Sequence, residues 1–132
     1  MSQKTALVLD DDRSLRTLLT AILEEKQFQV TAFADPLLYL DTLGRGHNEK
    51  TCPGFDIVLT DSQMPGMTGL EFLEKIRSTG CQIPAHRKAI ISGDWQKQDL
   101  EQARSSGFRI FHKPCPIDQI YAWLDEVSGQ NS

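Results

Sequence analysis

Acidic, hydroxyl and amine side chains stand at the ends of several apolar segments of this sequence. The residues concerned are Asp10, Asp11, Asp61, Ser92 and Lys113. Carboxylates brought close together repel one another by about 4 kcal/mol per pair at an effective dielectric of about 20, and a bound divalent cation relieves this repulsion. Because the ligand atoms are all oxygens, Mg²⁺ is the favoured cation. A lysine and a hydroxyl beside it would stabilise the oxygens of a transferable phosphoryl anion.

The elements that must bring these residues together alternate along the chain. Apolar segments typical of strands alternate with stretches of helical periodicity, which predicts a parallel sheet covered by helices. The predicted strands are residues 5–9, 28–33, 55–60, 89–91 and 108–112, and the predicted helices are residues 15–23, 37–43, 70–80, 100–106 and 117–124. Ligand sites of open parallel sheets lie at the carboxyl ends of the strands. We therefore predict a single α/β domain, a doubly wound five-stranded parallel sheet with five helices, whose site contains the five polar residues.

Composition limits the class of protein. The 132 residues are 39% apolar, which is enough for one hydrophobic core, and the net charge of −4 disfavours DNA binding by this chain alone. No apolar run approaches the roughly 18 residues of a membrane span, and no signal peptide precedes the first strand, so we expect a cytoplasmic protein without a membrane partner. Cys52, Cys81 and Cys115 form no CxxC pair, which predicts reduced thiols.

Four segments, in this order and spacing, resemble the receiver domain of two-component response regulators. They are residues 7–12 (LVLDDD), 56–69 (DIVLTDSQMPGMTG), 90–93 (IISG) and 111–114 (FHKP). The resemblance covers nearly the whole chain and implies the flavodoxin-like receiver fold over residues 1–127. Residues 128–132 would be a C-terminal tail or the start of a linker. Both a stand-alone receiver and the N-terminal part of a longer regulator remain open.

The resemblance also implies a role for each site residue. Asp61 would accept a phosphoryl group from a sensor histidine kinase or a histidine phosphotransfer protein, and the Lys113–Pro114 peptide bond would be cis. Ligands of Mg²⁺, for which Mn²⁺ can substitute, would be Asp10, Asp11, Asp61 and the backbone carbonyl of Gln63, and the phosphoryl oxygens would be bound by Ser92 and Lys113. The protein would be a switch that autodephosphorylates and does not turn over an exogenous substrate.

The sequence departs from the family at the position of the usual switching aromatic residue. Receivers commonly have Tyr or Phe three residues before the lysine, whereas this chain has Ile110. We therefore expect switching mainly through Ser92 and loop movement. The expected output is a protein-binding surface on the fourth helix, fifth strand and fifth helix, including Ile110 and Trp123. A downstream protein target or a second receiver would bind there.

Two alternatives lie in other functional classes. Residues 10–12 contain the DxD of haloacid-dehalogenase-like phosphatases, in which Asp10 would be the nucleophile, and residues 93–99 resemble their later acidic motif. That assignment leaves residues 61–69 unexplained, and the chain is short for such an enzyme. The second alternative is a phosphorylation-independent receiver-like interaction module. Such variants usually lose an acid or the lysine, and both are present here, but Ile110 keeps this alternative open.

Overall fold

A parallel sheet with helices on both faces forms the protein. The computed structural model describes residues 4–45, 55–78, 83–94 and 96–129. In these residues a five-stranded sheet has the order β2-β1-β3-β4-β5, with strands β1 (Lys4–Leu9), β2 (Phe28–Phe33), β3 (Ile57–Asp61), β4 (Lys88–Ser92) and β5 (Arg109–His112). The helices described are α1 (Arg13–Glu25), α2 (Pro36–Arg45), α3 (Gly69–Ser78), α4 (Lys97–Ser106) and α5 (Ile117–Gly129), and a 3₁₀ turn, η1 (Ala85–Arg87), precedes β4. The predicted doubly wound parallel sheet is confirmed.

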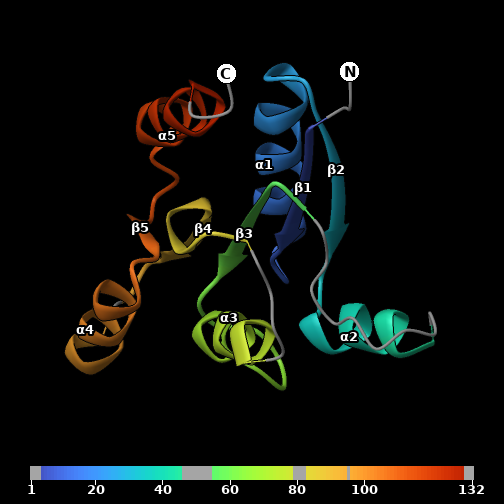
Figure 1. Ribbon diagram of the computed structural model, residues 1–132, viewed down its shortest axis with the longest axis vertical. Coiled ribbons are helices and arrows are strands. Elements are labelled where there is room, and N and C mark those ends of the chain that lie inside the picture. Colours follow the sequence, from blue (N-terminus) through green and yellow to red (C-terminus); the bar gives the residue numbers. More distant parts are fainter. Residues whose placement is uncertain (1–3, 46–54, 79–82, 95, 130–132) are drawn as a thin grey trace.

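The sheet separates two hydrophobic cores (Figure 1). Helices α1 and α5 cover one face, and α2, α3 and α4 cover the other. Because successive side chains of a strand point to opposite faces, Val8 and Leu59 lie in the α1/α5 core while Leu7 and Val58 lie in the α2/α3/α4 core. Burial on both faces explains why the central strands are apolar at nearly every position.

The three consecutive acids after β1 divide between two tasks. The Asp12 side chain caps α1 by accepting hydrogen bonds from the backbone N–H groups of Ser14 (2.9 Å) and Leu15 (3.4 Å). Such a cap satisfies donors that the first helical turn leaves unpaired. Asp10 and Asp11 are thereby left for the carboxyl edge of the sheet.

Several element boundaries differ from those predicted. Strand β3 begins at Ile57, later than predicted; just before it, the Asp56 side chain accepts a hydrogen bond from the Thr5 N–H at 2.7 Å, and the Asp56 N–H donates to the Thr5 carbonyl at 3.0 Å. The same strand includes Asp61 as its last residue. Helix α4 begins at Lys97, earlier than predicted. Its first turn is polar and lacks apolar periodicity, so the sequence pattern did not predict that turn. Among the described residues, no helix has the length and apolar character needed to cross a membrane.

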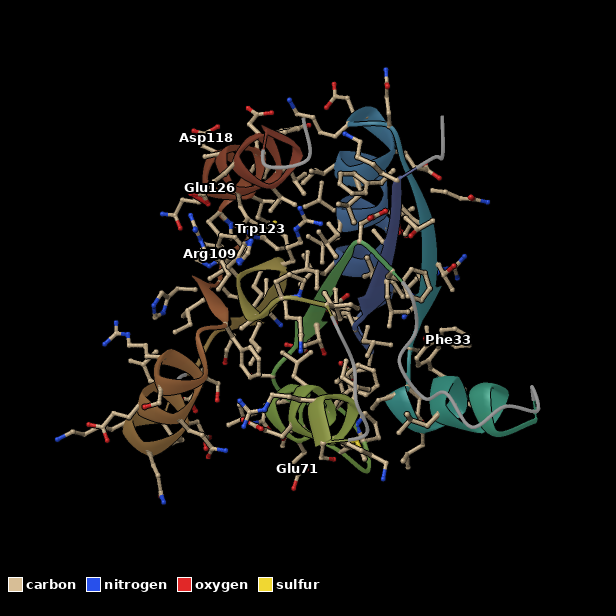
Figure 2. All side chains as sticks on the ribbon, in the orientation of Figure 1. Phe33, Glu71, Arg109, Asp118, Trp123 and Glu126 are labelled. Atoms are coloured by element: carbon tan, nitrogen blue, oxygen red, sulfur yellow. The ribbon has the colours of Figure 1, made fainter. Side chains whose placement is uncertain are left out.

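The prediction that Trp123 belongs to an exposed surface is wrong. Its side chain is fully buried and lies between α5 and the sheet, as Figure 2 shows. The indole ring packs edge-on against Phe111, with ring centroids 5.7 Å apart, and its Nε1–H donates to the carbonyl of His86 at 2.9 Å. The apolar stripe of α5 that predicted the helix faces the core, and Trp123 is part of that stripe. Of the three cysteines, Cys115 is a free, partly buried thiol, and the other two lie outside the described residues.

Candidate functional site

Three carboxylates converge at the carboxyl ends of β1 and β3. These strands are neighbours in the sheet, Asp10 and Asp11 directly follow β1, and Asp61 ends β3. One ligand oxygen from each lies within 4.8 Å of the others. Asp10 and Asp61 are buried, whereas Asp11 is exposed. The cluster is therefore anchored in the fold and reached from solvent on the side of Asp11.

Asp10 carries a buried oxygen without a donor. Its Oδ1 accepts a hydrogen bond from the Asp12 N–H at 2.8 Å, but no described residue donates to its buried Oδ2. The pKa of Asp10 is raised from 3.8 to about 6, chiefly by burial; the hydrogen bond from the Asp12 N–H lowers it, and the nearby Asp61 charge contributes to the rise. Buried polar atoms are normally paired. An unpaired carboxylate oxygen among other carboxylates is the donor set that a hard divalent cation such as Mg²⁺ requires, so the residues present fit that cation.

Lys113 places a positive charge beside Asp61. Its Nζ lies 3.1 Å from Asp61 Oδ1, and the backbone N–H of Ser62 donates to the same oxygen at 2.9 Å. Burial raises the pKa of Asp61, and the hydrogen bond and charge of Lys113 oppose that rise. The Lys113–Pro114 peptide bond is cis, as predicted. The Asp61 carboxylate is therefore oriented by two donors and partly neutralised by a cation that follows β5.

Ser92 is buried at the end of β4, and its hydroxyl has partners on both sides. It accepts hydrogen bonds from the Ser62 hydroxyl at 2.7 Å and from the Asp94 N–H at 3.2 Å. Ser62 was not among the residues predicted from the sequence to belong to the site. The signal was available in its position directly after Asp61, because the alternation of strand residues puts Ser62 opposite Ser92 once the β3/β4 register is known.

Close backbone approaches fix the loops that carry these residues. A Cβ atom at Gly69 would lie 2.2 Å from the carbonyl oxygen of Asp61, and the Gly69 N–H donates to the carbonyl of Ser62 at 3.0 Å. Arg16 of α1 reaches back and donates from Nη1 to the carbonyl of Asp10 at 2.8 Å. The loops after β1 and β3 are thus tied to the helices that follow them.

The structure brings together most of the residues that the sequence singled out. Asp10, Asp11, Asp61 and Lys113 form one cluster, and Ser92 ends the strand between those of Asp61 and Lys113. The side chain of Gln63 is exposed, and the role of its backbone carbonyl stays a prediction.

Sequence comparisons place the chain among signalling proteins. Residues 6–125 match the sequence model of the response regulator receiver domain. The transcriptional regulatory protein FixJ of Bradyrhizobium diazoefficiens is 34% identical over 126 residues, which are 93% of this chain and 56% of FixJ. Sporulation initiation phosphotransferase F of Bacillus subtilis is 29% identical over 122 residues, 91% of this chain and 90% of that protein. The chain therefore spans little more than half of FixJ and nearly all of the phosphotransferase.

Solved structures agree with this placement. The receiver domain of the Francisella response regulator 1452 has the same fold, with a TM-score of 0.77 at 22% identity over 98% of this chain and 99% of that one. Full-length FixJ from B. japonicum matches with a TM-score of 0.74 at 26% identity, over 98% of this chain and 60% of that one. Because the family match extends over most of its length, this chain belongs to the receiver domains of two-component response regulators.

Proposed function

We propose that Asp61 accepts a phosphoryl group in a Mg²⁺-dependent phosphorelay. One observation carries this proposal: three carboxylates and the Lys113 ammonium converge at one edge of the sheet, and no residue in the described part of the chain donates to Asp10 Oδ2. Phosphoryl transfer needs positioning and positive charge more than it needs covalent chemistry from the protein. The family match supports this proposal over the phosphatase alternative.

The chain's residues would divide the reaction as follows. An oxygen of Asp61 attacks the phosphorus of a phosphohistidine on a sensor kinase or phosphotransfer protein. The new phosphorus–oxygen bond forms as the phosphorus–nitrogen bond breaks, and the electron pair of the broken bond stays on the imidazole nitrogen. Lys113 neutralises charge on the transferred oxygens, and the hydroxyl of Ser92 turns to donate to one of them.

The acid cluster would hold the cation for this reaction. Its ligands would be Asp10, Asp11, Asp61 and the backbone carbonyl of Gln63. Bound there, Mg²⁺ neutralises charge on both the carboxylates and the phosphoryl oxygens. Without it, the neighbouring carboxylates would repel an incoming anion, so phosphorylation is expected to stop in a chelator.

The output surface in this proposal is formed by α4, β5 and α5. Strand β5 is an edge strand, which leaves one of its sides open to a partner. Ile110 is partly buried beside α4, and the exposed ion pair of Arg109 with Glu126, 3.0 Å long, joins β5 to α5 at this face (Figure 2). A downstream protein or a second receiver would bind here. The receiver would comprise residues 1–127. The response to phosphorylation would depend on the protein that binds this surface.

Mass spectrometry after incubation with acetyl phosphate and Mg²⁺ tests the proposal. We expect the gain of one phosphoryl group, its loss in D61N, and its slow release after the donor is removed. D118N is the matched control, because Asp118 is an exposed carboxylate of α5 outside the cluster. Undiminished phosphorylation of D61N, or full phosphorylation in excess chelator, would contradict the assignment. A wild-type protein that responds to neither acetyl phosphate nor beryllofluoride would favour the phosphorylation-independent module.

A further inference from the structure

A pair of serines joins the ends of β3 and β4. Asp61 is paired with Ile91 in the parallel register, so the next residues, Ser62 and Ser92, lie opposite each other. The Ser62 N–H extends the ladder by donating to the carbonyl of Ile91 at 3.0 Å. The two hydroxyl oxygens are 2.7 Å apart, with Ser62 as the donor. The contact therefore follows from the strand register, which the Ser62 N–H continues one residue beyond β3.

The serine pair and Asp61 belong to opposite faces of the sheet. The Asp61 side chain points to the same face of the sheet as that of Leu59, two residues earlier, which lies in the α1/α5 core. The Ser92 side chain points to the same face as that of Ile90, which lies in the α2/α3/α4 core. Hydrogen bonds from Ser62 and from the Asp94 N–H occupy both acceptor positions of the Ser92 hydroxyl on that second face. Because the hydroxyl lies on that second face, it would have to turn away from both donors to donate its own proton to a phosphoryl group on Asp61.

We propose that Ser62 is a latch, a positioning residue whose hydroxyl holds Ser92 in its unphosphorylated arrangement. This inference rests on the proposed phosphorylation of Asp61. The latch opposes the movement of Ser92 by the strength of one hydrogen bond. It thereby supplies a restraint on switching in a chain that has Ile110 in place of the usual aromatic residue.

A small cavity beside the pair limits the strength of this restraint. It has a volume of about 20 Å³, and its lining includes Ser62, Ser92, Thr68 and Asp99. A polar cavity of this size holds about one water molecule. When Ser92 leaves, water can therefore become the new partner of the Ser62 hydroxyl. The Ser62 hydroxyl then exchanges its hydrogen bond to Ser92 for one to water. Removing the Ser62 hydroxyl is therefore expected to shift the switching equilibrium toward the phosphoryl-bound state only about fivefold, the net effect of one neutral hydrogen bond.

Two substitutions at position 62 that are isosteric with each other test the latch. S62T keeps the hydroxyl, and S62V has a methyl group in place of the threonine hydroxyl. Calorimetric titration of beryllofluoride at saturating Mg²⁺ measures the phosphoryl-bound state of each. We expect S62V to bind beryllofluoride about fivefold more tightly than S62T, while both bind Mg²⁺ alone with equal affinity. In the S92A background the difference between the two is expected to vanish, since the latch has nothing to hold.

Each other outcome has a definite meaning. Equal affinities of S62T and S62V, or weaker binding by S62V, would overturn the latch, as would a difference that persists in S92A. If S62V does not fold, the comparison of S62A with the wild type gives the same decision. Absence of beryllofluoride binding by the wild type would overturn the proposed function and the latch together. Normal wild-type binding without the position-62 effect would overturn the latch alone.

Discussion

Replacing Asp10 with Asn is expected to stabilise the protein when no divalent cation is present. Asp10 is fully buried, and burial raises its pKa from 3.8 to about 6. A rise of about two pKa units corresponds to about 3 kcal/mol by which the charged form destabilises the fold. Asparagine removes that charge and keeps an oxygen for the Asp12 N–H, but its amide nitrogen replaces the unpaired Oδ2. A buried amide with imperfect partners costs about 1–3 kcal/mol, so we expect a net gain of about 1 kcal/mol.

The pH dependence separates this cause from a general packing effect. Below the unfolded-state pKa of 3.8, Asp10 is protonated in both the folded and the unfolded protein, and its burial then carries no cost of desolvating a charge. The cost grows as the pH rises through the folded pKa of about 6 and is complete above it. Urea unfolding in chelator should therefore show D10N as more stable than the wild type at about pH 7.5, and this advantage should fall as the pH is lowered and be lost by about pH 4, where only the cost of the buried amide remains.

Magnesium gives a second readout of the same substitution. Saturating Mg²⁺ is expected to raise the free energy of unfolding of the wild type and to have little effect on D10N, because a cation that binds only the folded state stabilises it. D118N, which changes an exposed carboxylate in the first turn of α5, should show neither the gain in stability at neutral pH nor a loss of the stabilisation by Mg²⁺. A folded D10N that is less stable than the wild type at neutral pH, or that gains as much from Mg²⁺, would refute the reasoning.

Further substitutions test other parts of the site. G69A is expected to lower the free energy of unfolding by about 2 kcal/mol or more, because its Cβ would lie 2.2 Å from a backbone oxygen; G93A, whose Cβ would meet Lys113 at an ordinary 3.5 Å, is the control in urea unfolding, and equal losses would contradict the close contact. K113M is expected to reduce the rate of phosphorylation by acetyl phosphate about 100-fold, the usual order for losing one charge-stabilising donor, and an unchanged rate in stopped-flow measurements would remove Lys113 from the reaction. Substituting Gln63 or Asp94, which lie two residues beyond Asp61 and Ser92 and are expected to border the path of an attacking water, should change the rate of autodephosphorylation more than phosphoryl uptake; an unchanged lifetime in the double variant would contradict this.

The sequence predicted the topology and the acid cluster because both follow from local pattern. Apolar runs that end in Asp10 or Asp61 identify strands and their carboxyl ends at once, and parallel strands leave few ways to arrange those ends. The Ser62 to Ser92 contact was missed because it depends on register, which the pattern of one strand does not specify. The exposure of Trp123 was predicted wrongly because helical periodicity identifies a stripe of side chains without saying whether the stripe faces the core or a partner.

The sheet with a separate core on each face has a consequence for how such a protein can diversify. Asp61 belongs to the face covered by α1 and α5, and the serine pair belongs to the face covered by α3 and α4. Asp61, the last residue of β3, and Ser62, which follows it, are consecutive residues whose side chains point to opposite layers. Substitutions on the outer side of α1 or α5 therefore leave the serine contact intact. Grafting the outer surface of α1 from one receiver onto another should leave the serine contact unaltered, whereas α5 also belongs to the proposed output surface.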